Sequence, residues 1–260
     1  MKRVRFLRPM LMLGLPLAVA LLAAFFVAGN ARAATLIHSY DFASGLSGIS
    51  DSVGGQNGTL FNGASVQGHA LVTDGVNDYV EFATQIVPNS GSFSVAFWVN
   101  QASRSGTWTE VISQGAQAGS GFYLGHNPSG TIRVADLHQD TGVQFGPLNT
   151  WMQFTLTVDP TAGTKLYRDG GLIYNVAGGL NTTNSGSATR LGRQFGAFSE
   201  YFSGSVDDLK IYTGALSVVE AQALYAAGRS VGVVPEPGSW ALWVLGLGLL
   251  GWARHARQTG

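Results

Sequence analysis

The chain has 260 residues, of which 45% are hydrophobic and 12% are charged, and its formal net charge is zero. It contains no cysteine, which excludes disulfides, zinc–thiolate sites and a cysteine nucleophile. All but one of the 15 acidic residues, but only 8 of the 15 basic residues, lie between Ala34 and Val234. This central region is therefore mildly acidic and gives no electrostatic reason to bind nucleic acid.

The N-terminal segment has the three parts of a secretory signal peptide. Basic residues precede an apolar stretch from Leu11 to Val27, and Ala31-Arg32-Ala33 follows as a small-x-small cleavage sequence. We expect signal peptidase to remove residues 1–33, which leaves Ala34 as the new N-terminus. An uncleaved N-terminal anchor helix is the alternative, because the apolar stretch is long for a signal peptide.

Residues 34–230 carry short runs of β-branched and aromatic residues that are bounded by turn residues, a pattern that predicts strands. The runs are 36–42, 68–73, 78–83, 93–99, 111–112, 122–124, 132–134, 151–158, 164–168, 172–176, 190–192 and 206–212. Asp169-Gly170 is typical of a hairpin turn. Strands in this succession, without helices between them, predict an all-β fold, an antiparallel two-sheet β-sandwich in one domain. We expect Trp98 and Trp151 to anchor its core.

One short helix is predicted near the end of this domain. Ser217 and Glu220 fit a capping box, and Gly228 stands where a glycine commonly ends a helix. We expect Val219 and Ala223, with Leu224, to face the sandwich.

The remaining residues, 231–260, form a separate segment. Val234-Pro235-Glu236-Pro237 precedes an apolar run over 238–253, which a basic end at 254–257 follows. The run predicts a hydrophobic helix, although its roughly 16 residues fall short of the ~17–25 that a spanning helix needs.

Several stretches resemble the laminin-G-like or concanavalin A-like jelly-roll superfamily. They are LVTDGVNDYVEF from Leu71, GSFSVAFWVN from Gly91, NTWMQFTLTVD from Asn149 and GSVDDLKIYTGALSVVEAQALY from Gly204. The resemblance covers about 36–228 and implies a jelly-roll sandwich. Members of this superfamily serve as lectins, adhesins, hydrolases and structural modules, so the fold does not choose the function.

The C-terminal segment resembles the PEP-CTERM sorting signal, with Val234, Pro235, Glu236 and Pro237 as the motif. The resemblance implies recognition by exosortase, a membrane enzyme that acts near this motif. The protein would be held in the inner membrane of a Gram-negative bacterium by the C-terminal helix, and then reach the cell surface or extracellular matrix. The basic end would stay on the cytoplasmic side. The alternative is that Glu236 is a solvated linker charge.

No catalytic pattern is present. Glycosidases of this fold carry E-x-D-x-E or E-x-D-x-x-E on one strand, which places two carboxylates on one face. None of the five glutamates here has an aspartate two residues later, and no G-x-S-x-G elbow occurs. Isolated histidines at 38, 69, 126 and 138 are more typical of surface or packed positions. We therefore predict that the protein is not an enzyme.

Calcium is the one predicted cofactor, because related sandwiches hold Ca²⁺ with loop oxygens. The candidate ligands are Asp74, Asn77, Asp78, Asp207 and Asp208, with Asp41 and Asp51 as further candidates. The alternative is that these residues form turns and bond their own backbone.

Aromatic residues in or near loops are the candidates for contact with a polysaccharide. They are Trp108, Tyr123, Phe145, Phe195, Phe198 and Tyr201. Aromatic faces stack on sugars, although such residues also pack loops. The sequence therefore predicts an exported, surface-directed carbohydrate-binding or adhesion module. The alternatives are a structural matrix protein without a ligand and a glycan hydrolase with an unfamiliar site.

Overall fold

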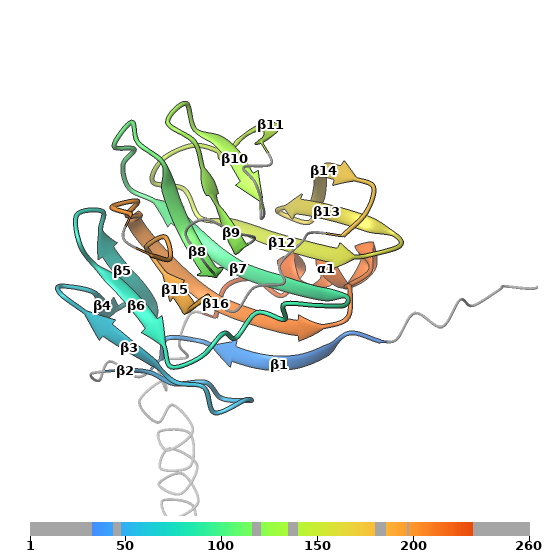
Figure 1. The fold of residues 1–260 in the computed structure, drawn as a ribbon, viewed down its shortest axis with the longest axis horizontal. Helices are drawn as coiled ribbons and strands as arrows, with labels where there is room; N and C mark the ends of the chain where they lie inside the picture. The colour runs from blue at the N-terminus through green and yellow to red at the C-terminus, as the bar shows by residue number, and fades with distance from the viewer. Residues whose placement is uncertain are drawn as a thin grey trace, which may run out of the picture. The chain divides into compact units, whose positions relative to one another are not determined.

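The computed structural model describes residues 33–43, 48–115, 121–134, 140–179, 186–196 and 198–230, whose fold Figure 1 shows. The predicted sorting segment at 231–260 and, apart from Ala33, the predicted signal peptide lie outside these residues. The described strands are β1 (Thr35–Tyr40), β2 (Gly48–Ile49), β3 (Gly58–Phe61), β4 (Ser65–Gln67), β5 (Ala70–Asp74), β6 (Tyr79–Phe82), β7 (Phe93–Gln101), β8 (Thr109–Gly115), β9 (Gly121–His126), β10 (Thr131–Val134), β11 (Asp140–Gln144), β12 (Met152–Asp159), β13 (Gly163–Arg168), β14 (Gly171–Val176), β15 (Ser187–Leu191) and β16 (Ser203–Thr213). Helix α1 (Val218–Ala226) follows β16.

The strands form two antiparallel sheets, which confirms the predicted all-β sandwich. Sheet A has the order β14-β13-β12-β7-β16-β5-β4, with β1 also paired to β16. Sheet B has the order β11-β10-β9-β8-β15-β6-β3-β2. In Figure 1, β7 and β16 run side by side through the middle of sheet A, and they are far apart in the sequence.

Alternation along each strand places one set of side chains between the sheets and the other set outside. In sheet B, one inward row crosses six strands through Leu60, Val80, Leu191, Ile112, Leu124 and Val134. In sheet A, Phe97 lies opposite Phe154. The two layers meet where Phe93 and Phe122 pack edge to face, with their ring centroids 5.9 Å apart.

Four described strands were not among the predicted runs. β2, β3, β4 and β11 have two to five residues each, and they lie near or at the edges of the sheets. Such strands have too few residues to display a clear alternation. The predicted turn at Asp169-Gly170 is confirmed, because both residues have positive φ angles, 52° and 73°, as a type I′ hairpin turn requires.

The prediction that Trp98 and Trp151 anchor the core was wrong. Trp98 lies on the outer face of sheet A, where its ring stacks on Tyr225 of α1 with centroids 5.8 Å apart. The guanidinium of Arg229 lies 4.4 Å from the Trp151 ring. Both rings therefore serve the packing of α1 and of the residues up to Ser230 against sheet A, since the inward positions of β7 and β12 belong to other residues.

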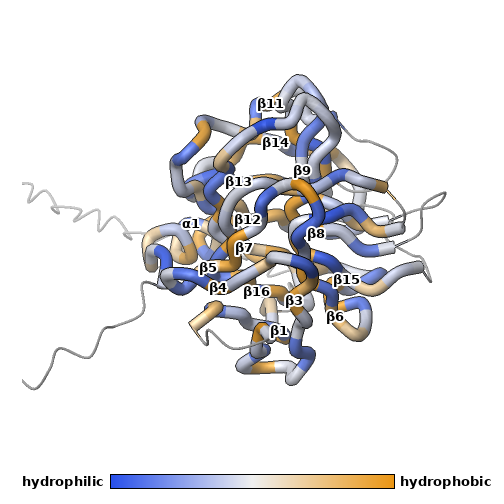
Figure 2. The backbone as a smooth tube through the Cα atoms, turned by 90° about the vertical axis from the view of Figure 1, so that its left-hand side faces the viewer, coloured by the Kyte–Doolittle hydropathy of each residue, from blue (hydrophilic) through white to orange (hydrophobic). Residues whose placement is uncertain are grey.

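Helix α1 has the predicted capping box, in which Ser217 and Glu220 bond each other's backbone N–H groups. Its predicted contact face was wrong at Val219 and Ala223 and right in part at Leu224. Ala221 is fully buried and Leu224 is half-buried, whereas Val219 is 69% exposed and Ala223 is also exposed. Figure 2 shows α1 on the opposite side of sheet A from β8, β15 and β6 of sheet B. The helix therefore covers part of the outer face of sheet A.

Candidate functional site

The predicted calcium ligands Asp74, Asn77 and Asp78 lie in one tight turn between β5 and β6. Oδ1 of Asp74 accepts the N–H groups of Val76 at 2.7 Å and Asn77 at 3.3 Å. The Val76 bond is the main cause that lowers the pKa of Asp74. The carboxylate of Asp78 accepts the N–H groups of Gly63 at 2.7 Å and Asp74 at 3.2 Å. The carboxylate oxygens of Asp74 and Asp78 thus accept hydrogen bonds from backbone N–H groups. This arrangement agrees with the alternative that these residues form turns.

Asp207 and Asp208 lie elsewhere on sheet A. Ser203 of β16 is opposite Asp74, so Asp207 is four residues further along the strand, about 13 Å away at a rise of about 3.3 Å per residue. A bulge interrupts β16 here, and Asp208 has a φ of 48°. The bulge interrupts the strict alternation that would place the two carboxylates on opposite faces of the strand. Asp207 bonds Arg229 at 2.8 Å and Asp208 accepts the N–H of Ser230, so both hold the residues that follow α1.

The structure does not bring the five predicted calcium ligands together. Among the residues that the structure describes, no group of three or more His, Asp or Glu side chains is arranged to hold a metal ion. The carboxylates at both places are engaged by N–H groups or by a guanidinium, a donor set that does not fit a calcium site as folded. Calcium binding stays a prediction, and a melting temperature that responds to calcium and to a chelator would support it.

The outer face of sheet B carries a different set of side chains. One outward row crosses five strands through Thr59, Glu81, Arg190, Ser113 and Tyr123. In the neighbouring rows, Phe61 lies opposite Tyr79, and Gly125 lies between Glu110 and Arg133. Side chains alternate between the two faces of a strand, and the neighbouring positions belong to the inward row described above. These residues therefore lie on the outer face.

A buried charged group lies under this face. The guanidinium of Arg133 bonds Oε1 of Glu110, and the same Nη2 lies 3.8 Å from Oε2 of Glu200. Arg133 is 1% exposed and Glu110 is fully buried. Gly125 makes room for this arrangement, because a Cβ atom there would collide with the Glu110 carboxylate and with the backbone of Thr109.

Burial has the largest effect on the acids of this group. It raises the pKa of Glu110 to about 8, with the Glu200 charge acting in the same direction and Arg133 opposing both. Burial also raises the pKa of Glu200, again against Arg133. Oε2 of each acid has no hydrogen-bond partner within the described part of the chain. The group is thus a polar site with spare acceptor capacity beneath an aromatic cover.

That cover is formed by aromatic rings, and Trp108 lies outermost. Its ring centroid is 3.9 Å from the Arg133 guanidinium, and that of Tyr123 is 4.8 Å away. Trp108 is 37% exposed, whereas Tyr123 is 3% exposed. A guanidinium against ring faces is a cation–π arrangement, which orients both groups.

The other aromatic candidates divide between packing and surface. Phe145 is fully buried in the core, and Phe195 is 3% exposed and packs against Tyr123. Phe198 is 37% exposed and Tyr201 is half-buried. Sequence reasoning missed Phe61 and Tyr79, whose rings stack with centroids 4.8 Å apart. The strand that carries Phe61 was itself missed, so no pattern placed it beside Tyr79.

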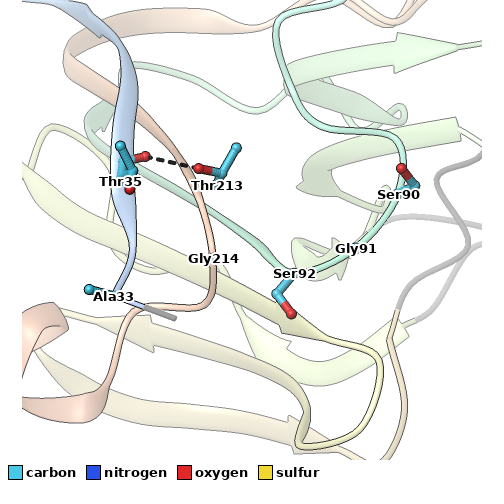
Figure 3. Close-up of a pocket in the computed structure, with 7 residues that line it drawn as sticks. All are labelled: Ala33, Thr35, Ser90, Gly91, Ser92, Thr213 and Gly214. Carbon is cyan, nitrogen blue, oxygen red and sulfur yellow. Dashed lines mark hydrogen bonds between the residues drawn. The ribbon is translucent and has the colours of Figure 1, made fainter. Parts of the chain in front are cut away.

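A cavity of about 610 Å³ lies away from this face, at the start of β1 and the end of β16 (Figure 3). Its lining is Ala33, Thr35, Ser90, Gly91, Ser92, Thr213 and Gly214. In the close-up, Thr35 and Thr213 lie side by side across the two strands. The lining contains no aromatic or charged residue and includes Ala33, which the predicted cleavage removes. This cavity is therefore a weaker candidate than the outer face of sheet B.

Neither described histidine with a buried partner forms part of a hydrolytic triad. His38 bonds Asp51 at 2.7 Å, and the Asp51 carboxylate also accepts backbone N–H groups of Ser39 and Gln56. Burial raises the pKa of Asp51, but these bonds outweigh it and lower the value to about 2. His126 contacts Gln101 and the carbonyl of Asn127. In the described ranges, no serine hydroxyl bonds either ring, while His138 lies outside them.

The sorting motif at Val234, Pro235, Glu236 and Pro237 and the apolar run at 238–253 lie outside the described residues. Within those residues, no helix has both the length and the apolar character that a membrane crossing requires.

Comparison with known proteins gives two family matches. The concanavalin A-like lectin/glucanases superfamily matches residues 74–222, and the PEP-CTERM protein-sorting motif matches residues 233–258. Both resemblances seen in the sequence are thereby confirmed.

One curated relative is an alpha-L-arabinofuranosidase of Bifidobacterium longum subsp. longum, 27% identical over 227 residues. The match covers 75% of this chain and 21% of the enzyme, so the chain spans about a fifth of this relative's length.

Solved structures share the fold at low identity. Domain 4 of AbnA, a GH43 extracellular arabinanase from Geobacillus stearothermophilus in complex with arabinotriose, gives a TM-score of 0.58 at 21% identity, over 74% of this chain and 98% of that domain. Trypanosoma rangeli sialidase in complex with the inhibitor DANA gives 0.61 at 15% identity, over 76% of this chain and 33% of the sialidase. The binding domain of botulinum neurotoxin serotype D gives a TM-score of 0.56 at 17% identity, over 75% of this chain and 52% of that one.

Proposed function

The chain belongs to the concanavalin A-like lectin/glucanases superfamily and carries a PEP-CTERM sorting motif, and from this premise we propose that it is an exported carbohydrate-binding module. The proposed binding surface is the outer face of sheet B. The module acts at the cell surface or in the extracellular matrix, by adhesion to a polysaccharide and without catalysis.

The observation that carries the proposal is the position of Trp108. Its ring is 37% exposed and lies over the Arg133 guanidinium, next to the buried acids Glu110 and Glu200. A sugar ring has an apolar face of C–H groups and an edge of hydroxyl groups. An exposed aromatic ring accommodates the first, and the carboxyl group of Glu200, whose side chain is 16% exposed, is the charged group of this site within reach of the second. A few polar groups within an aromatic surface are typical of ligand sites.

The same geometry favours binding over hydrolysis. Glu110 and Glu200 both approach one nitrogen of Arg133, and two close carboxyl groups are what a retaining glycosidase uses. Glu110, however, is fully buried, so its carboxyl group has no access to a glycosidic oxygen. Hydrolysis by this pair is the second candidate function, and a structural matrix protein without a ligand is the third.

A binding experiment distinguishes the three. The full chain, purified in detergent, is titrated with neutral polysaccharides, beginning with arabinan because two relatives are arabinose-specific by name. We expect saturable binding without release of reducing ends, and a loss of at least tenfold in affinity in Trp108→Ala. Tyr225→Ala, at an exposed ring of α1 on the sheet A side, is the control. Release of reducing ends that Glu200→Gln abolishes would favour the hydrolase. Absence of both binding and turnover would favour the structural protein.

Export and processing form the second part of the proposal. Signal peptidase removes residues 1–33, and exosortase acts at the motif of Val234, Pro235, Glu236 and Pro237 after the apolar run has held the protein in the membrane. The PEP-CTERM match supports the exosortase step. Mass spectrometry of the surface product checks both ends. A surface product that begins at Met1, or that retains Trp240 to Arg257, would contradict it.

A further inference from the structure

Two arginine side chains on the outer face of sheet B converge on one point. Nη1 of Arg190 and Nη2 of Arg193 both donate to the carbonyl oxygen of Gly196, at 3.1 Å and 3.4 Å. Both guanidinium groups also face the Tyr79 ring, at 5.6 Å and 5.0 Å from its centroid. Two positive charges therefore lie within a few ångströms of each other.

The described residues supply one carboxylate for these two charges. Nε of Arg190 pairs with Glu81 at 2.6 Å. No carboxylate of the described chain pairs with Arg193, and of its two terminal nitrogens only Nη2 donates to an acceptor among those residues. Arg193 thus keeps unused donors, although the domain around it has more acidic than basic residues.

Aromatic rings fix the position of these donors. The Tyr201 ring lies 5.3 Å from the Arg193 guanidinium, and the two residues form an isolated antiparallel β-bridge. Phe61 stacks on Tyr79 and is 36% exposed. A guanidinium held between ring faces keeps its N–H groups in one plane, which is the geometry that suits a planar or tetrahedral oxyanion.

We propose that Arg190 and Arg193, held over Tyr79 and beside Tyr201, bind the anionic group of an acidic polysaccharide, a carboxylate or a sulfate ester. This inference rests on the proposed function, because it names the class of glycan that the outer face of sheet B recognises. An anion at this point would offset the repulsion between the two cations and use the spare donors of Arg193. The adjacent ring of Phe61 would contact the apolar face of the same or the next sugar.

The test compares polymers that share a backbone and differ in charge. Binding of the full chain to polygalacturonate, to carboxyl-reduced polygalacturonate and to a sulfated form of the reduced polymer is measured at one ionic strength. We expect the charged polymers to bind at least tenfold more tightly than the reduced polymer. The stronger of the two charged ligands identifies the anionic group.

Variants locate the site. Arg193→Gln should lose at least tenfold in affinity for the charged polymer and leave affinity for the neutral polymer unchanged. Arg193→Lys, which keeps the charge, should retain part of the affinity and controls for altered folding. Lys165→Gln removes a positive charge from sheet A, and we expect no effect.

The outcomes separate this inference from the proposed function. Equal binding of neutral and charged polymers, with a loss in Trp108→Ala, would overturn the anion site and leave the proposed function standing. Equal losses in Arg193→Gln and Lys165→Gln would also overturn it, because the effect would then be net charge alone. Absence of binding to every polymer would overturn both.

Discussion

The outer faces of the two sheets each carry an arginine that contacts an aromatic ring and pairs with a buried acid, but the two arginines serve different purposes. On sheet A, Arg229 lies against the Trp151 ring and pairs with Asp207, while Trp98 stacks on Tyr225. On sheet B, Arg133 lies against Trp108 and pairs with Glu110. In each case a guanidinium lies between a ring and a buried carboxylate.

The two groups differ in how far other parts of the chain cover their aromatic rings. On sheet A, α1 and Arg229 lie over Trp98 and Trp151, which are half-buried, whereas Trp108 and Phe61 on sheet B are exposed. A cation–aromatic group alone therefore does not indicate a ligand site. Its exposure does, because a group already covered by the chain has no face left for a partner.

The largest expected effect comes from the buried pair of sheet B. Glu110→Ala leaves the Arg133 charge buried with its principal partner removed, so we expect the free energy of unfolding to fall by about 3–5 kcal/mol. Urea denaturation followed by circular dichroism measures it. A loss below 1 kcal/mol would mean that Trp108 and Tyr123 alone stabilise the cation, and that the group is not built around its acid.

Glu110→Gln is the control, and it also tests the raised pKa of Glu110. The folded protein holds this proton up to a pH of about 8, whereas the unfolded chain releases it near pH 4.5. This contribution to stability is therefore complete below pH 4.5 and is lost as pH rises through 8. We expect the stability of Glu110→Gln to depend less on pH between 5 and 9 than that of the wild type.

The second prediction concerns the ring that sheet A covers. Trp98→Ala removes a half-buried ring from between β7 and α1, and we expect a loss of about 2–4 kcal/mol with glycan binding unchanged. Trp108→Ala should give the reverse, with lost binding and a small change in stability. If Trp98→Ala weakened binding while the fold stayed intact, the assignment of roles to the two faces would be wrong.

A smaller effect is expected for the ion pair that fastens the C-terminal residues. Arg229→Gln leaves Asp207 buried without its guanidinium, which should cost about 1–3 kcal/mol. The loss is limited because burial already raises the pKa of Asp207 to about 7, with Arg229 opposing it, so the acid can take up a proton. A double-mutant cycle with Asp207→Asn measures the coupling, and near-additive losses would argue against the pair.

The smallest effect is expected at the start of α1. Ser217→Ala removes the capping box and should cost about 1 kcal/mol. Glycan binding should stay unchanged, since α1 covers sheet A. Ser217→Asp restores an acceptor and is the control. Weaker glycan binding in Ser217→Ala would show that the two faces are not independent.

Much of the fold could be predicted from the sequence because its signals are local. Strands such as β7 and β12 alternate over eight or nine residues, and the Asp169-Gly170 turn and the capping box each depend on adjacent residues. The short strand β3 has only Gly58 to Phe61 to display a pattern, so it was missed, and with it the Phe61–Tyr79 stack.

The candidate site could not be predicted in the same way. Glu110, Arg133 and Glu200 come from three distant stretches, and their meeting depends on the order of strands in sheet B. The type of residue suggested that Trp98 lies in the core, although alternation along β7 places it on the outer side of the strand. The Trp98 ring is half-buried on the outer face, because α1 packs against sheet A at that point. The sorting motif was readable because it is a contiguous stretch that needs no tertiary context.

The bonds from Asp207 to Arg229 and from Asp208 to Ser230 have a consequence for the tether between domain and motif. Three residues, 231–233, separate Ser230 from Val234, and an extended chain spans at most about 3.6 Å per residue. If exosortase cuts at the motif as proposed, the cut therefore lies within a distance of the folded body that is shorter than the width of a small domain. A protease that works there must accept a bulky neighbour, and an unfolded domain would present it with a different substrate.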